Sequence, residues 1–345
     1  MTGYTGTNTL SASAGSISPL TTGAFVNGVW TGSVSLNTAG SITISTSGGG
    51  ATGTSSAINV YTPTLTSFSF GTISGTKTAG TTFSVTITAK DQNGNTMTSY
   101  NGLTTLTETG GGAGGTVSSP SVTFSNGVYT GNVYVTKAGS GVTITATSGT
   151  TSTTSVSTFT VNMGAVVSVT VSPVTDSVTA GSQVTYTATG TDAYGNTGSI
   201  TNSVTWSITT GTGGSWDNNV YTSHTAGTWT VTANAGGGVT GTATLTVTAG
   251  ALTQFVFSHI NTQTSGIAFS VTITAEDQYG NTVTNYAGTQ TLHCSSGSAT
   301  LTPTTVTFTN GVATPSVTIT VSSSRNLDLY ITYNGNQYTS NTFTV

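Results

Sequence analysis

The chain has 345 residues, of which only 3% are charged, and its formal net charge at pH 7 is −4. Four Lys and Arg residues are too few to neutralise a phosphate backbone or to form a basic membrane patch, which excludes nucleic acid as a partner. No stretch approaches the ~20 apolar residues of a membrane span, and a single cysteine, Cys294, excludes an intrachain disulfide.

Apolar residues alternate with Thr and Ser along most of the chain. Val85, Ile87 and Ala89 form one such series. A period of two predicts strands with one face in a core and the other in water. Turn signals separate the series every 8–12 residues or so, which is typical of β-sandwiches, and strong helix formers are scarce. The sequence therefore predicts an all-β chain without helix.

Repeated endings divide the chain into segments. The same type of final strand occurs at residues 56–60, 157–161, 243–247 and 341–345. Short connectors follow the first three of these strands. The length also suits three to four domains. We therefore predict domains at 1–62, 63–163, 164–248 and 249–345, joined in a linear array with limited bending.

The first of these segments is incomplete. Residues 4–10 align with residues 100–106 and 286–292, but only the later copies are preceded by an early strand, at 83–92 and 269–278. A sandwich without its early strands exposes core and a bare sheet edge. The side chains expected in the resulting groove are Leu10, Phe25, Val29 and Val34. Either the chain is cut from a longer repeat protein, or another subunit supplies the strands in a head-to-tail polymer.

The two early strands differ at one position in ten, and each runs into an Asp-x-x-Gly-Asn motif. This motif occurs at Asp91, Asp192 and Asp277. An Asp at this position accepts hydrogen bonds from its own backbone, and Gly allows positive φ, so the motif predicts a tight turn.

A calcium loop is the alternative for the first copy of this motif. Asp91, Asn93 and Asn95 would place oxygen ligands at its first, third and fifth positions. The other copies have Tyr at the third position, and no Glu closes any loop. We therefore predict no metal and no other cofactor, with these three residues as the weak candidate.

A second turn type, Asn-Gly-Val, begins at Asn27, Asn126 and Asn310 and predicts hairpins. Together with the Asp-x-x-Gly-Asn turns that follow apolar strands, it resembles the bacterial Ig-like domains of invasin- and intimin-type surface proteins. The resemblance covers all four segments. It implies tandem Ig-like sandwiches, an extracellular location on the cell surface, and a role in building stalks.

Few residues suggest chemistry. No nucleophile motif, phosphate loop or Cys/His cluster is present, so we expect no enzyme activity and no catalytic residues. Trp216 follows Gly213-Gly214-Ser215 in a predicted loop and is the candidate for stacking on a glycan, whereas Trp206 is expected in the core.

Three functional hypotheses follow. The first is a structural stalk or filament segment, whose partners are further copies or neighbouring domains of a longer chain. The second is an adhesin that binds a glycan or a host or cell-surface protein through its domain faces. The third is an accessory region of a secreted enzyme.

A linear array should be elongated in solution. We predict that small-angle scattering of the purified chain gives a radius of gyration well above the globular value of about 20 Å for this length. A radius near that value would contradict the linear array.

Overall fold

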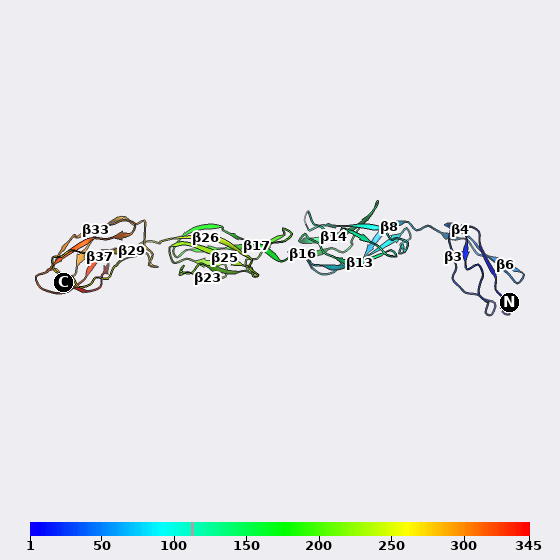
Figure 1. Cartoon of the computed structure of the whole chain (residues 1–345), viewed down its shortest axis with the longest axis horizontal. Coiled ribbons are helices and arrows are strands. Elements are labelled where there is room, and N and C mark those ends of the chain that lie inside the picture. Colours follow the sequence, from blue (N-terminus) through cyan, green and yellow to red (C-terminus); the bar gives the residue numbers. More distant parts are fainter. Residues whose placement is uncertain (112–113) are drawn as a thin grey trace. The chain divides into compact units, whose positions relative to one another are not determined.

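The computed structural model describes residues 1–111 and 114–345, and within these residues the regular structure consists of β-strands (Figure 1). The prediction of an all-β chain is confirmed. The chain divides into two compact units, Met1–Asn162 and Met163–Val345. The described strands pair within four groups, two in each unit. The predicted boundaries after residues 62, 163 and 248 fall between these groups, and we propose the groups as the domains of the chain.

The N-terminal strand group consists of short strands in three small sheets, ordered β1-β5-β6, β2-β3 and β4-β7. Its strands are β1 (Thr9–Ala12), β2 (Ile17–Ser18), β3 (Ser35–Leu36), β4 (Gly40–Ile42), β5 (Ile44–Gly48), β6 (Ala51–Thr54) and β7 (Ile58–Val60).

The second strand group is a sandwich of two sheets, one ordered β13-β10-β8 and the other β12-β11-β14-β16-β9, with β15 paired to β14. Its strands are β8 (Leu65–Phe70), β9 (Lys77–Thr78), β10 (Phe83–Asp91), β11 (Leu103–Thr109), β12 (Ser121–Thr123), β13 (Val128–Val133), β14 (Gly139–Ser148), β15 (Thr151–Thr154) and β16 (Phe159–Asn162). Both sheets contribute side chains to one core, as the period of two predicts.

The third strand group has its own core, in which Tyr186, Leu245 and Val231 are buried. Its strands are β17 (Val166–Ser172), β18 (Thr175–Thr179), β19 (Gln183–Thr185), β20 (Thr187–Asp192), β21 (Thr197–Ser199), β22 (Thr205–Ile208), β23 (Ser215–Asp217), β24 (Val220–Thr222), β25 (Gly227–Asn234) and β26 (Thr240–Thr248).

The fourth strand group repeats the plan of the second around a core that includes Phe255, Ile273 and Phe308. Its strands are β27 (Gln254–Phe257), β28 (Phe269–Ser270), β29 (Ile273–Glu276), β30 (Gly288–Thr291), β31 (His293–Cys294), β32 (Thr300–Thr302), β33 (Thr305–Phe308), β34 (Val312–Ala313), β35 (Ser316–Thr320), β36 (Asn326–Leu327), β37 (Leu329–Tyr333), β38 (Asn336–Thr339) and β39 (Phe343–Thr344).

The Asn-Gly-Val turns have the predicted hairpin geometry. Asn27, Asn126 and Asn310 have φ values of 51°, 49° and 49°, and the Gly after each has φ of 75–77°. Positive φ at two successive residues matches the twist of the flanking strands. The turns therefore fix an equivalent register in three of the groups.

Within the described residues, no helix has both the length and the apolar character needed to cross a membrane. The thiol-bearing residue, Cys294, is a half-buried side chain packed against the core of the fourth strand group.

Candidate functional site

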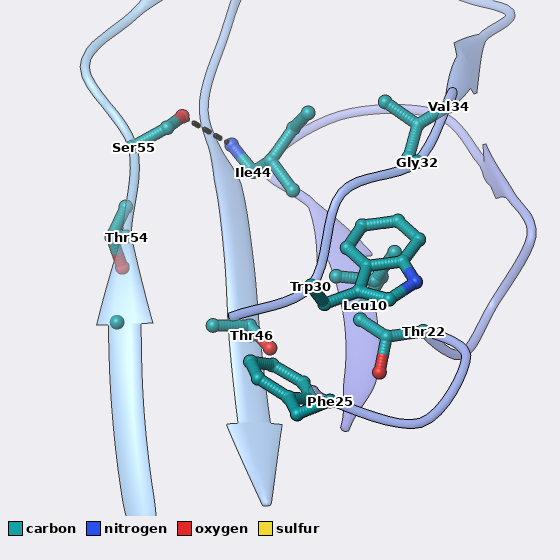
Figure 2. Close-up of a pocket in the computed structure, with 11 residues that line it drawn as sticks. Leu10, Thr22, Phe25, Trp30, Gly32, Val34, Ile44, Thr46, Thr54 and Ser55 are labelled. Carbon is teal, nitrogen blue, oxygen red and sulfur yellow. Dashed lines mark hydrogen bonds between the residues drawn. The ribbon is translucent and has the colours of Figure 1, made fainter. Parts of the chain in front are cut away.

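An open cavity of about 490 Å³ lies in the N-terminal strand group (Figure 2). Its walls come from β1, from β5 and β6, and from the segment that precedes β3. The lining residues are Leu10, Thr22, Phe25, Trp30, Gly32, Val34, Ile44, Thr46, Gly53, Thr54 and Ser55. Three of the four residues expected in the groove, Leu10, Phe25 and Val34, are among them.

Val29 is the exception, and its expected place in the groove needs correction. It is 64% exposed and does not line the cavity. Val29 and Val34 are five residues apart, and successive side chains of an extended segment point to opposite faces. The two therefore cannot share one face, and the even-numbered Trp30, Gly32 and Val34 face the cavity instead.

Trp30 and Ile44 are cavity residues that the sequence analysis missed. Figure 2 shows the Trp30 ring in the middle of the open space, with Leu10 behind it and Ile44 on the neighbouring strand. An internal comparison would have found both. Aligning the two Asn-Gly-Val turns places Trp30 at the position of Tyr129, and aligning the following strands places Ile44 at that of Ile144.

The same comparison shows how much the N-terminal strand group lacks. Val34 is 36% exposed, whereas its counterpart Val133 is 0% exposed. Ile58 on β7 is 39% exposed, whereas Phe159 is 5% exposed. In the second strand group these positions are covered because β10 and β8 complete the sheet that contains β13, and the two sheets cover each other's inner faces. Residues 1–62 contain no counterpart of those strands, so the apolar face remains uncovered.

The backbone beside the cavity is open as well. Residues 30–34 form no strand ladder in the described part of the chain. Their counterparts, residues 129–133 of β13, all pair with β10. All four residues of β6 are exposed. An unpaired edge with free N–H and C=O groups is a template for another strand. Neither residues 30–34 nor β6 carries a charged side chain that would prevent such pairing.

The Asp-x-x-Gly-Asn motif forms the predicted tight turn in all three copies. Oδ1 of Asp277 accepts hydrogen bonds from the backbone N–H groups of Tyr279 (2.8 Å) and Asn281 (2.9 Å). Asp91 and Asp192 accept the equivalent pairs at 2.9 Å. Gly94, Gly195 and Gly280 have φ of 78–80°, which explains the invariant Gly of the motif.

The second carboxylate oxygen has a role that the sequence analysis missed. It accepts a hydrogen bond from the connector that leads into the same strand group. The donors are the Tyr61 hydroxyl to Asp91 (3.0 Å), the Gly164 N–H to Asp192 (2.8 Å) and the Gly250 N–H to Asp277 (2.7 Å). Each motif therefore anchors its own entering connector. The bonded residues are 30, 28 and 27 positions apart in the three copies, so no fixed spacing in the sequence pointed to this contact.

The third copy of the motif, Asp277 to Asn281, also holds the preceding strand group. Nδ2 of Asn281 donates to the His224 carbonyl oxygen, and Oδ1 of Asn281 accepts from the Ala226 N–H, both at 2.7 Å. The Tyr279 ring stacks on the His224 ring at a centroid distance of 4.5 Å. Asn281 and Asp277 are buried. This junction between the third and fourth strand groups is therefore fixed by directional bonds.

These hydrogen bonds set the charge state of the Asp residues. Burial acts to raise the pKa of the Asp277 carboxyl, but the bonds from Asn281, Gly250 and Tyr279 outweigh burial and hold the pKa below its usual value. The pKa of Asp192 is lowered in the same way, against burial, by Asn196, Gly164 and Tyr194. The ionised form is thus the one that the turn requires.

The absence of a metal stays a prediction, and the hydrogen bonds do not favour the weak calcium candidate formed by Asp91, Asn93 and Asn95. Both oxygens of Asp91 face N–H or O–H donors, and the Asn95 side chain donates to the Tyr61 hydroxyl. Among the described residues, no three His, Cys, Asp or Glu side chains are grouped as a metal site would need.

Trp216 is not in an exposed loop, and this expectation is corrected. It lies on β23, where pairing with Tyr221 on β24 directs the half-buried ring toward the third core. Its ring stacks on the Trp206 ring with a centroid distance of 5.9 Å. Its indole N–H is buried without a partner among the described residues. A glycan platform needs an open ring face, which these contacts do not leave on the side toward Trp206.

Among the described residues, the fold is a series of β-sandwich strand groups, and the N-terminal strand group has an apolar cavity beside the unpaired residues 30–34. No protein-family model and no curated protein matches the chain. Similar solved structures include FdeC, an Escherichia coli adhesin, with a TM-score of 0.42 and 22% identity, covering 84% of this chain and 99% of that chain.

Two further structures are similar to the chain. Domains 4–9 of the surface-layer protein SbsC give a TM-score of 0.28 and 19% identity, covering 97% of this chain and 57% of that chain. Invasin, a bacterial integrin-binding protein, gives 0.30 and 16%, covering 79% of this chain and 59% of that chain. Invasin is thus among the similar structures, as the turn motifs predicted.

The burial difference between repeat copies predicts unequal responses to one substitution. Ile144→Ala removes fully buried methyl groups and should cost about 2–5 kcal/mol, lowering the melting temperature of the second strand group by roughly 10 °C or more. Ile44→Ala removes a side chain that already faces an open cavity and should have less than half that effect. Scanning calorimetry of the two variants checks this, and equal shifts would show that the groove is closed in solution.

The Asp turns predict a loss of stability in acid. Their folded pKa lies below the unfolded value of about 3.9, so the stabilisation is present above that value and is lost as pH falls through the folded pKa. The melting temperature of the second unit should therefore fall below about pH 4. The variant Asp277→Asn should melt lower at pH 7 and show a weaker acid dependence.

The exposed carboxylate of Asp217 provides the matched control, because Asp217→Asn should leave both quantities unchanged. Melting curves of the three proteins from pH 2 to pH 8 decide the matter. An unchanged acid dependence in Asp277→Asn would contradict the assignment.

Proposed function

We propose that this chain is a non-enzymatic structural module of the extracellular cell surface, a stalk or filament segment. It joins its neighbour in the assembly when another subunit supplies strands that complete the N-terminal strand group. The observation that carries this proposal is the contrast between the open groove and the same position in the second strand group, where β8 and β10 fill it.

The use of polar residues supports a structural role. In a chain with eight Asp and Glu residues, three of the acidic side chains are buried in turns that anchor connectors. A carboxylate that accepts three or four hydrogen bonds is held in its ionised form and is a poor proton donor. These residues therefore serve a structural role, because they hold the connectors between strand groups with directional bonds.

The surface chemistry supports an extracellular location. The outward positions of the strands are mostly Thr and Ser, which are hydrated through hydroxyl groups rather than charges. Surface charges are screened by salt and titrate with pH, whereas hydroxyl groups respond to neither. A surface built in this way suits a protein exposed to surroundings whose salt and pH are not controlled.

Site-specific photo-crosslinking on intact cells tests the assembly. A photoreactive amino acid replaces Val34, which faces the groove, or Thr31, which faces away, in the full-length protein. We expect the Val34 position to cross-link to a strand of a different polypeptide, with the cross-linked peptide identified by mass spectrometry. The Thr31 position should give at least tenfold less of this product.

The source of the occupant decides the outcome. Cross-linking only to the same polypeptide would mean that a segment of a longer chain fills the groove, and the assembly proposal would be wrong. Cross-linking to a host glycoprotein or another non-strand target would favour the adhesin hypothesis instead. No cross-link at Val34 would show that the groove is empty on the cell and would also contradict the proposal.

A further inference from the structure

The second strand group shows which strand fills the position beside its Asn-Gly-Val turn. β10 is antiparallel to β13 and lies between β13 and β8. Three of its pairs serve as markers of register, namely Phe83 with Val133, Ile87 with Tyr129, and Thr88 with Val128.

The fourth strand group repeats this register independently. Residues 269–275, from β28 into β29, have the same sequence, Phe-Ser-Val-Thr-Ile-Thr-Ala, as residues 83–89 of β10. Their pairs are Phe269 with Val317, Ile273 with Ala313, and Thr274 with Val312. In both groups, the residues that pair with this strand are the seventh, third and second residues after the Asn of the Asn-Gly-Val turn. The strand sequence and its register therefore belong together.

Asn27 fixes the equivalent positions in the N-terminal strand group as Val34, Trp30 and Val29. Building on the proposed function, we infer that the partner subunit donates an antiparallel strand of the pattern Phe-Ser-Val-Thr-Ile-Thr-Ala to residues 29–34. Its Phe lies opposite Val34, its Ile opposite Trp30 and its final Thr opposite Val29.

The cavity fits the inward side chains of such a strand. In β10 the inward Val85, Ile87 and Ala89 are buried in the core that contains Leu106, Phe124 and Ile144. The counterparts of the last three are Leu10, Phe25 and Ile44, which Figure 2 shows around one open space. The donated strand would therefore place its Val and Ile side chains against the same three residue types.

The Phe of the pattern has a place of its own. The Phe83 and Phe159 rings pack edge to face with their centroids 5.6 Å apart, and the Phe269 and Phe343 rings do the same at 6.0 Å. The N-terminal strand group has Ile58 at this position, and Ile58 is exposed. A donated Phe would cover it and remove an exposed apolar side chain from water.

The donor brings a second strand for the same structural reason. In the second and fourth strand groups, the strand beside the Asn-Gly-Val hairpin is also paired on its other edge, β10 with β8 and β29 with β27. β8 also bonds β15, through the Phe68 N–H to Thr153 Oγ1 and Thr151 Oγ1 to the Leu65 carbonyl. β6 is the counterpart of β15 and is fully exposed. The donor is therefore a strand pair that covers residues 29–34 and β6 together.

A synthetic peptide with the sequence of residues 63–92 serves as the probe, because it contains both strands. Its binding to the full chain is measured by fluorescence anisotropy. The control peptide has the same composition but carries Val85→Thr, Thr86→Val, Ile87→Thr and Thr88→Ile, which moves the apolar side chains to the opposite face. We expect the control to bind at least tenfold more weakly.

Variants of the chain locate the bound peptide. Ile44→Lys should weaken binding at least tenfold, whereas Val167→Lys, on the surface of the third strand group, should not change it. Equal binding of the two peptides, or binding unaffected by Ile44→Lys, would overturn the inference.

Disulfide trapping reads the register directly and does not depend on the Ile44 variant. The chain carries Val34→Cys with Cys294→Ala, and three peptides carry Phe83→Cys, Val85→Cys or Ile87→Cys. The Phe83→Cys peptide should cross-link at least tenfold faster than the other two, because cross-strand neighbours alone meet the geometry of a disulfide. Equal rates, or fastest reaction of the Ile87→Cys peptide, would show a different register.

The two proposals fail separately. Binding in this register together with purely intramolecular cross-linking on cells would refute the partner subunit and leave the pattern of the strand standing. Cross-linking to a partner subunit without binding in this register would refute the pattern and leave the assembly standing.

Discussion

A β-sandwich needs two conditions at once: every buried strand has hydrogen-bonded neighbours, and every apolar sheet face has a second sheet over it. The second strand group meets both because β10 pairs with β8 on one side and β13 on the other. The N-terminal strand group meets neither along residues 30–34. Its cavity, its exposed Val34 and its exposed β6 are three consequences of the same missing pair of strands.

The few charges of the chain are used where directional bonds matter. Hydrophobic packing within each strand group is not directional. The Asp-x-x-Gly-Asn motif adds directional bonds, because one carboxylate oxygen shapes the turn and the other holds the connector. Asn281 extends the same network to the preceding strand group. In a chain this poor in charge, a buried carboxylate with fully used oxygens is a structural element.

The sequence predicted the features that depend on local patterns. The period of two gave the strands, Asn-Gly-Val gave the hairpin turns, and the missing early strand led to Leu10, Phe25 and Val34 in the groove. It failed where a side chain's face depends on pairing across strands. Val29 lies on the opposite face from Val34 because the two are an odd number of residues apart, and Trp216 lies on the short strand β23 although Gly residues precede it.

Other features could not be derived from local patterns at all. The bond from Gly250 to Asp277 joins residues 27 positions apart, and no rule of spacing gives such a contact without the fold. Trp30 was recognisable only by comparison with Tyr129. Internal repeats thus held more information about the site than the motifs themselves, because each complete copy shows how the incomplete one is filled.

The central claim is that residues 30–34 form an open edge that another strand closes. Amide hydrogen exchange of the full chain, with and without the peptide of residues 63–92, measures this directly, with residues 128–133 as the internal reference for a paired edge. We predict fast exchange at 30–34 in the free chain and at least ~10-fold slower exchange with the peptide bound, while 128–133 stay protected in both. Protection of 30–34 equal to that of 128–133 in the free chain would contradict the account.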